Sequence, residues 1–73
     1  MTDKLPILSG KDVIKALSKL GYTVNDQKGS HIHLRHQVRR PLTVPNHPEI
    51  ARGTLRIFIK DADLTVEKFL ELL

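Results

Sequence analysis

The sequence predicts an α+β fold, in which one sheet of three short antiparallel strands packs against helices as a two-layer sandwich. Apolar residues recur at helical spacing near both ends of the chain, whereas the middle alternates apolar and polar residues as half-buried strands do. The 73 residues fit one small domain, residues 1–73, because domains typically hold ~100–200 residues. A chain this short and without cysteine excludes a dinucleotide fold, a deep cofactor cavity and a disulfide framework.

The first predicted element is a helix over Ser9–Leu20. Ser9, followed three positions later by Asp12, is typical of a capping box at a helix N-terminus. Apolar residues follow at helical spacing: Val13, Ile14, Leu17 and Leu20. Gly21 stands where a C-terminal cap belongs. The other side of this helix carries lysines four residues apart, which favour a solvated face over a nucleic-acid contact: Lys11, Lys15 and Lys19.

Three strands are predicted next: Tyr22–Asp26, His31–Arg35 and Leu42–Val44. In the first strand, Tyr22 and Val24 alternate with polar residues, which predicts that these two side chains are buried together. The segment 27–30 is typical of a hairpin turn, in which Gly29 is free to take a positive φ. The segment 36–40 forms a second turn. Pro41 and Pro45 bracket the third strand and favour an edge position for it, because proline cannot donate to a strand ladder.

The remainder of the chain predicts helices. Pro45–Pro48 is irregular, because two prolines interrupt it. Helical spacing then predicts a second helix that begins near Gly53 or Thr54, with these apolar residues: Leu55, Phe58, Ile59 and Ala62. Thr65 is a predicted N-cap for a short last helix. The inward residues predicted for this last helix are Phe69, Leu70 and Leu73.

Basic residues gather in the middle of the chain. Twelve Lys and Arg against eight Asp and Glu give a net charge of +4. Between Lys28 and Arg56 there are six basic residues and one acidic residue, a net charge of +5, whereas the last fourteen residues carry a net charge of −2. All four histidines lie in the same basic stretch: His31, His33, His36 and His47. This distribution favours an anion-binding surface with groups that titrate near neutral pH, although a solvated surface fits it too.

The chain gives no signal for a membrane segment or for secretion. It has no apolar run of ~18 residues, the length that a membrane-spanning helix needs. Met1–Leu8 lacks the apolar core of a signal peptide. We therefore expect a cytoplasmic protein.

The second predicted strand carries the most informative chemistry, because successive side chains of a strand point to opposite faces. Ile32 and Leu34 are expected to face the core. His31, His33 and Arg35 then share the open face, with about 7 Å between alternate residues. A metal-free ribonuclease needs such groups: one histidine takes the proton from the RNA 2′-hydroxyl, and a second group protonates the leaving 5′-oxygen. A cation offsets the charge that develops on the phosphate.

Two other interpretations of this strand stay open. His-x-His on a strand is also a spacing for metal ligands, although the lack of cysteine and the neighbouring Arg35 disfavour a structural metal site. Histidines that lie on the surface without any chemistry fit the same pattern. Spacing alone does not decide among the three.

Several segments occur here in a particular order: Gln27-Lys28-Gly29-Ser30-His31, Leu42-Thr43-Val44-Pro45 with His47, and Arg52-Gly53-Thr54-Leu55-Arg56. With a leading Ser-Gly-Lys helix and a closing Leu-Thr-Val-Glu-Lys-Phe, the chain resembles the HicA (YcfA-like) mRNA interferase toxins of type II toxin–antitoxin systems. The resemblance covers about Leu8 to Leu72. The Gly-Ser-His and Gly-Thr-Leu-Arg pair at this separation is a fairly specific signature.

The resemblance implies a fold like that of double-stranded-RNA-binding domains, α-β-β-β-α, here with a short extra C-terminal helix. It implies a ribosome-independent endoribonuclease that cleaves mRNA and is encoded beside a HicB antitoxin, which covers the histidine-bearing face. The catalytic histidine of the family follows Gly-Ser, and that position is His31 here. By the same resemblance, cleavage requires neither a metal ion nor a bound cofactor.

With the resemblance, His31 is the predicted general base, and His33 is a second catalytic candidate that acts as an acid or contacts phosphate. The RNA-binding candidates in and around the turns are Lys28, Gly29, Ser30, Arg35, Arg39 and Arg40. The alternative function is a non-catalytic module that binds double-stranded nucleic acid.

The chain departs from common family members at three positions. Asp26 stands where a basic residue is frequent, and we expect this acid either to weaken RNA binding or to tune His31. Leu34 stands where an aromatic residue is frequent, which preserves a core role. Asp63 stands where glycine is usual, which affects local geometry more than chemistry.

Overall fold

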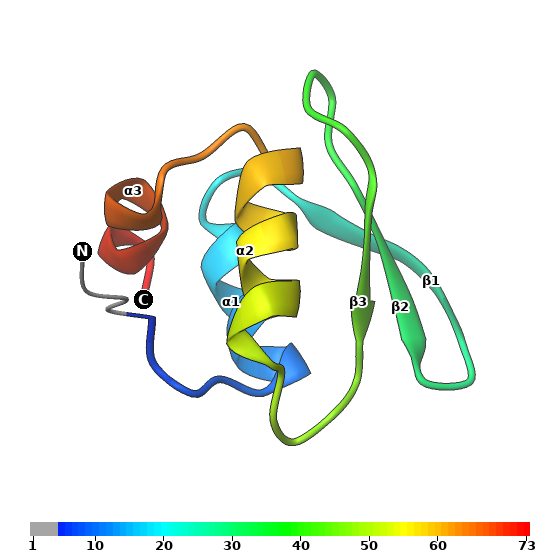
Figure 1. The fold of residues 1–73 in the computed structure, drawn as a ribbon. Helices are drawn as coiled ribbons and strands as arrows, with labels where there is room; N and C mark the ends of the chain where they lie inside the picture. The colour runs from blue at the N-terminus through cyan, green and yellow to red at the C-terminus, as the bar shows by residue number, and fades with distance from the viewer. Residues whose placement is uncertain (1–4) are drawn as a thin grey trace.

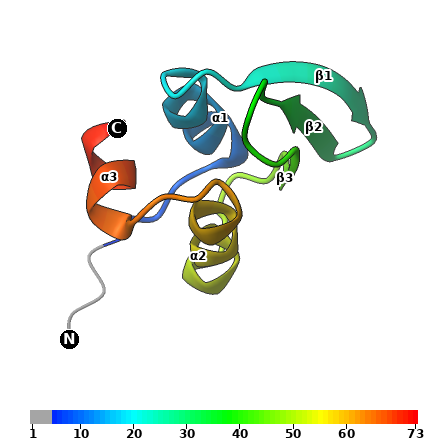
Figure 2. The same ribbon diagram turned by 90° about the horizontal axis from the view of Figure 1, so that it is seen from above.

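The computed structural model describes residues 5–73. The elements follow in the order α1 (Gly10–Ser18), β1 (Thr23–Lys28), β2 (His31–Arg35), β3 (Leu42–Pro45), α2 (Arg52–Asp61) and α3 (Val66–Glu71). The strands form one antiparallel sheet in the order β1-β2-β3. Helices α1 and α2 lie on one side of this sheet, and its other side is uncovered (Figures 1 and 2). The predicted α+β order is therefore confirmed, including the short C-terminal helix and the edge position of β3.

Residues 1–4 lie outside the described residues. The predicted single domain 1–73 and the Met1–Leu8 segment are therefore described only from Leu5 onward. Within that part of the chain, no helix is long and apolar enough to cross a membrane.

Helix α1 has the predicted cap at its start. The Ser9 hydroxyl accepts a hydrogen bond from the Asp12 amide at 3.1 Å, and the Asp12 carboxylate accepts one from the Ser9 amide at 3.2 Å. The helix ends at Ser18 rather than at the predicted Leu20. Gly21 closes it with a φ of 110°, and the Tyr22 amide reaches back to the Leu17 carbonyl at 3.2 Å, as in a glycine C-cap.

The β1–β2 hairpin has a tighter turn than predicted. Lys28 pairs with His31, so only Gly29 and Ser30 connect the strands, and β1 extends two residues past the predicted end at Asp26. Gly29 has a φ of 59°, and a positive φ at the first of two loop residues is typical of a type II′ turn.

The prediction that Val24 is buried with Tyr22 is wrong. Tyr22 precedes β1 and is 2% exposed, whereas Val24 is 55% exposed. Every residue of β1 is exposed, because this edge strand extends past the area that the helices cover (Figure 2). The register also shifts between Val24 and Asp26, which leaves Asn25 as an extra residue in the strand.

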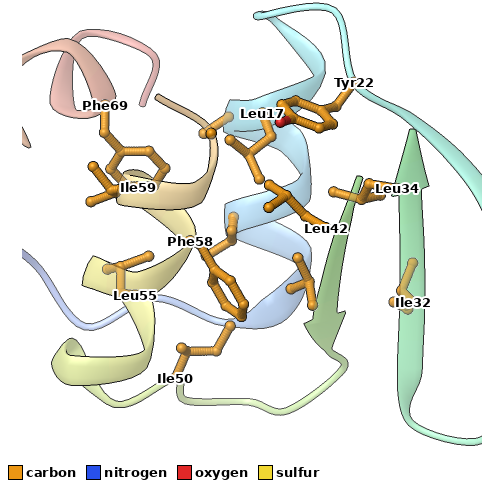
Figure 3. Close-up of a cluster of buried hydrophobic side chains, with 14 of the residues drawn as sticks. Leu17, Tyr22, Ile32, Leu34, Leu42, Ile50, Leu55, Phe58, Ile59 and Phe69 are labelled. Carbon is orange, nitrogen blue, oxygen red and sulfur yellow. The ribbon is translucent and has the colours of Figure 1, made fainter. Parts of the chain in front are cut away.

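The hydrophobic core lies between the sheet and the helices (Figure 3). Strands β2 and β3 contribute Ile32, Leu34, Leu42 and Val44. The helices and the segment before β1 contribute Val13, Ala16, Leu17, Tyr22, Leu55, Phe58, Ile59 and Phe69. Leu5, Ile50 and Ala62 complete the cluster. The predicted core face of α2 is confirmed, although this helix begins at Arg52, before the predicted start, and its N-cap Ala51 has no side-chain hydrogen bond.

Helix α3 begins after the predicted N-cap Thr65, but it ends before Leu73, which was expected to face the core. The Thr65 hydroxyl accepts a hydrogen bond from the Lys68 amide at 3.1 Å, and Phe69 is fully buried. Leu70 is partly buried, but the prediction that Leu73 faces inward is wrong, because Leu73 is 48% exposed. The helix stops at Glu71, so helical spacing no longer directs Leu73 to the core.

Candidate active site

The two faces of β2 have different environments. Ile32 and Leu34 are buried toward the helices, whereas His31 and Arg35 are exposed and His33 is half-buried. The predicted separation of core and open faces is therefore confirmed. Because paired residues of antiparallel strands point to the same side of a sheet, the partners of the three polar residues complete the open face.

His31 lies at the hairpin end of this face, beside the turn. Its strand partners are Lys28 on β1 and Pro45 on β3. The hairpin end is held by the Ser30 carbonyl, which accepts a hydrogen bond from the Asn46 amide at 2.6 Å. Within residues 5–73 the His31 imidazole has no hydrogen-bond or ion-pair partner. Both of its ring nitrogens are therefore open to a ligand.

His33 lies one row further along the sheet and has a partner on each side. Its Nδ1 is 3.0 Å from the Thr43 hydroxyl on β3, and its Nε2 is 3.9 Å from the Asp26 carboxylate on β1. A shallow depression of about 470 Å³ lies over this row, and Lys28 and Arg35 also line it. The structure thus brings His33, two cations and one acid together on the open face.

His36 has a structural role. Its Nδ1 accepts hydrogen bonds from the Val38 and Arg39 amides, each at 3.1 Å, so this nitrogen carries no proton. Its Nε2 therefore carries the proton and donates to the Leu20 carbonyl at 3.0 Å. The ring packs on Tyr22 with centroids 4.8 Å apart. His36 thus ties the loop between β2 and β3 to the end of α1.

The other basic candidates lie away from His31 and His33. The Arg39 Nη1 donates to the Ala62 carbonyl at 2.6 Å, at the C-terminal end of α2, where a cation is favourable. The Arg40 carbonyl accepts a hydrogen bond from the Tyr22 hydroxyl at 2.8 Å, and its side chain is exposed. Their loop is at the opposite end of the sheet from the Gly29 turn (Figure 1). RNA contacts by Arg39 and Arg40 stay predictions.

His47 is exposed in the segment between β3 and α2. Its carbonyl accepts a hydrogen bond from the Gly10 amide at 2.9 Å. The preceding residue, Asn46, is bonded to Ser30. The backbone around His47 therefore connects the start of α1 to the turn that presents His31.

Sequence reasoning missed the two neighbours of His33. Asp26 was expected to affect His31, but the register places it opposite His33, and Thr43 was given no role. The signal that identifies Asp26 is the length of the turn. With only Gly29 and Ser30 in the loop, Lys28 pairs with His31, and Asp26 then pairs with His33.

The acidic and histidine side chains of residues 5–73 form no group of three or more that is arranged to hold a metal ion. The polar groups of the open face are instead histidines, cations, one carboxylate and one hydroxyl. Imidazoles suit proton transfer near neutral pH, and cations suit phosphate oxygens.

The helix–strand–strand–strand–helix order and the open polar sheet define an α+β domain like the double-stranded-RNA-binding domains. The model of a protein family described as the HicA toxin of bacterial toxin–antitoxin matches residues 10–64. The chain belongs to this HicA toxin family. No curated protein gives a match. The chain is thus a toxin of a toxin–antitoxin system, and its family supports a nuclease role and RNA targets in general terms.

Proposed function

We propose that this toxin is a ribosome-independent mRNA interferase, an endoribonuclease that cleaves RNA with His31 as its general base. The observation that carries the proposal is the position of His31. This side chain is exposed at the end of the open sheet face, and no residue of the described chain occupies its ring nitrogens. A general base must reach the proton that it removes, and an exposed imidazole without a partner meets this condition.

In the proposed reaction, His31 takes the proton of a 2′-hydroxyl group, and the 2′-oxygen attacks the adjacent phosphorus. The bond from phosphorus to the 5′-oxygen breaks, and a second group gives a proton to that oxygen. The products are a 2′,3′-cyclic phosphate and a 5′-hydroxyl group. All atoms come from RNA and from protons that the protein exchanges, so this step needs neither a metal ion nor a cofactor.

Lys28 and Arg35 are the proposed phosphate contacts. Both are exposed and line the depression on the open face. Gly29 and Ser30 form the turn that presents His31, and the exposed Ser30 hydroxyl is available to donate to a phosphate oxygen. With one Tyr, two Phe and no Trp, base stacking contributes little, so we expect modest sequence selectivity.

The proposed partner is an antitoxin of the HicB type that covers the open face. The face carries Lys28, Arg35 and two histidines with one acid, so an acidic surface on the antitoxin is electrostatically complementary to it. An antitoxin placed there excludes RNA from His31. Co-purification of the two proteins, with loss of RNA binding in the complex, is the expected result.

The test is cleavage of a purified single-stranded RNA by His31→Ala. We expect the cleavage rate to fall by ~100-fold or more, in the range of general acid–base catalysis. The free energy of unfolding should change by less than about 0.5 kcal/mol, because the side chain is exposed and unpaired. His47→Ala, another exposed histidine of the basic stretch, is the matched control and should keep its activity.

Undiminished cleavage by His31→Ala refutes the assignment of the base. Activity that survives a chelator supports the proposed metal-free reaction, and activity that a chelator removes contradicts it. RNA bound by the wild-type protein without any product supports the alternative function, a non-catalytic module for double-stranded nucleic acid, which the fold also favours.

A further inference from the structure

Asp26, His33 and Thr43 lie side by side across all three strands. Asp26 and Thr43 are the direct strand partners of His33, so the three side chains point to the same open face. Asp26 is the only acidic residue within the strands that the structure describes. The only carboxylate of the described strands therefore lies opposite His33.

The two neighbours lie beside different nitrogen atoms of the His33 ring. The Thr43 hydroxyl, at 3.0 Å from Nδ1, is an acceptor for an Nδ1 proton and fixes the orientation of the ring. The Asp26 carboxylate, at 3.9 Å from Nε2, is close enough to act through its charge but too far for a hydrogen bond. A proton on Nε2 is thus not held by the protein. The side chain is 39% exposed, so this proton is accessible to bound RNA.

The charged groups on the face separate the two histidines. His31 has Lys28 as its strand partner, whereas His33 has Asp26, whose carboxylate is 3.9 Å from its Nε2. Lys28 and Arg35 also line the depression over His33, and Thr43 on β3 is uncharged. The carboxylate lies next to the His33 ring and stabilises a positive charge on it. A neutral imidazole is a base, and a charged one is an acid.

We propose that His33 is the general acid of the RNA cleavage and that Asp26 is its positioning residue, with Thr43 fixing the ring. The inference rests on the proposed function and names the second group that the reaction requires. The Nε2 proton of His33 passes to the leaving 5′-oxygen as the bond from phosphorus to that oxygen breaks. His33 becomes neutral and keeps its Nδ1 proton, which is hydrogen-bonded to the Thr43 hydroxyl. The proton of the 2′-hydroxyl group is then on His31.

Asp26→Asn tests the charge with little change in shape. The rate of RNA cleavage is measured against pH for the full chain. We expect the rate on the alkaline limb of the profile to fall by about fivefold, because the carboxylate charge beside the His33 ring is lost, whereas on the plateau below the limb the rate changes by less than about twofold.

Three variants control this measurement. Asp26→Glu restores the negative charge and should return the limb to its wild-type position. Glu67→Gln removes one negative charge from the exposed side of α3 and should leave the profile unchanged. Thr43→Val removes the hydroxyl group that holds Nδ1 and should lower the plateau itself, because the ring is no longer oriented.

A rate that falls equally at all pH values in Asp26→Asn, or does not fall, overturns the role of Asp26 while leaving the proposed function intact. A wild-type protein that cleaves no RNA overturns the proposed function itself.

Discussion

At the scale of single residues, histidines that look alike in the sequence have different roles because their neighbours differ. His36 has both ring nitrogens bonded to backbone groups and joins two segments. His33 has a hydroxyl on one nitrogen and a carboxylate near the other. His31 has no side-chain partner within the described chain. Of these three, only His33 and His31 have a ring nitrogen that a substrate can reach.

Tyr22 gives a prediction at this scale. Burial raises the pKa of its hydroxyl above the ordinary value of 10.0; nearby Arg39 opposes this shift, and Asp61 adds to it. The un-ionised form is favoured in the folded state, so this contribution to stability is complete below pH 10. It is lost as pH rises through the folded-state pKa, because the unfolded chain has already released its proton.

Tyr22→Phe should therefore cost about 1 kcal/mol of unfolding free energy at neutral pH, because the hydrogen bond to the Arg40 carbonyl is lost. Above pH 10 the difference between the two proteins should shrink. Urea denaturation of both proteins at a series of pH values measures this difference in unfolding free energy. Absorbance of the single tyrosine follows the ionisation directly. A difference that stays constant into strongly alkaline solution contradicts the prediction.

At the scale of elements, two glycines near helix starts have opposite environments. A Cβ built on Gly10 at the start of α1 would overlap the Pro45 carbonyl oxygen, and its amide donates to the His47 carbonyl. A Cβ on Gly53 in α2 has no atom within 4 Å. Gly10 therefore allows α1 to pack directly on the chain after β3, whereas Gly53 is free of any packing requirement.

Gly10→Ala should lower the free energy of unfolding by about 2 kcal/mol, the usual cost of forcing an extra methyl group into a packed contact. Gly53→Ala should raise it by about 0.5 kcal/mol, because alanine loses less backbone entropy in a helix. Chemical denaturation of both variants measures the pair. Equal effects from the two substitutions contradict this account of α1 packing.

At the scale of the whole molecule, the two layers separate stability from chemistry. The helices and one side of the sheet form the core, and the other side remains uncovered with Lys28, Arg35 and the two histidines. The lysines on the exposed side of α1 form a second basic surface. If RNA binds where the histidines are, the first surface and not the second should determine its affinity.

Salt dependence of RNA binding tests this in His31→Ala, chosen to prevent cleavage. Each phosphate contact contributes about 0.7 to the slope of log affinity against log salt for single strands. Lys28→Gln with Arg35→Gln should reduce the slope by about 1.4, and Lys11→Gln with Lys15→Gln by less than about 0.5. Fluorescence anisotropy of a labelled RNA measures both. A larger effect from the α1 pair moves the binding surface to that helix.

The sequence by itself determined the order of the elements, the capping box at Ser9, the cap at Thr65 and the two faces of β2. These features depend on neighbours a few positions away in the chain, whose effects on backbone geometry are regular. The burial of Val24 and Leu73 was predicted wrongly by the same rules. Burial depends on how far the helical layer extends over a strand and where a helix stops, and local spacing contains neither.

Only the tertiary structure decided which histidine has which neighbours. It bonded His36 to Leu20 just after α1, placed Arg39 at the end of α2 and set Asp26 and Thr43 on either side of His33. The physical reason is that strand register depends on the geometry of a turn and on how the apolar residues of different strands pack together, which couples residues that are distant in the chain. Residue types along the chain therefore indicated the kind of chemistry, and the register between strands arranged it.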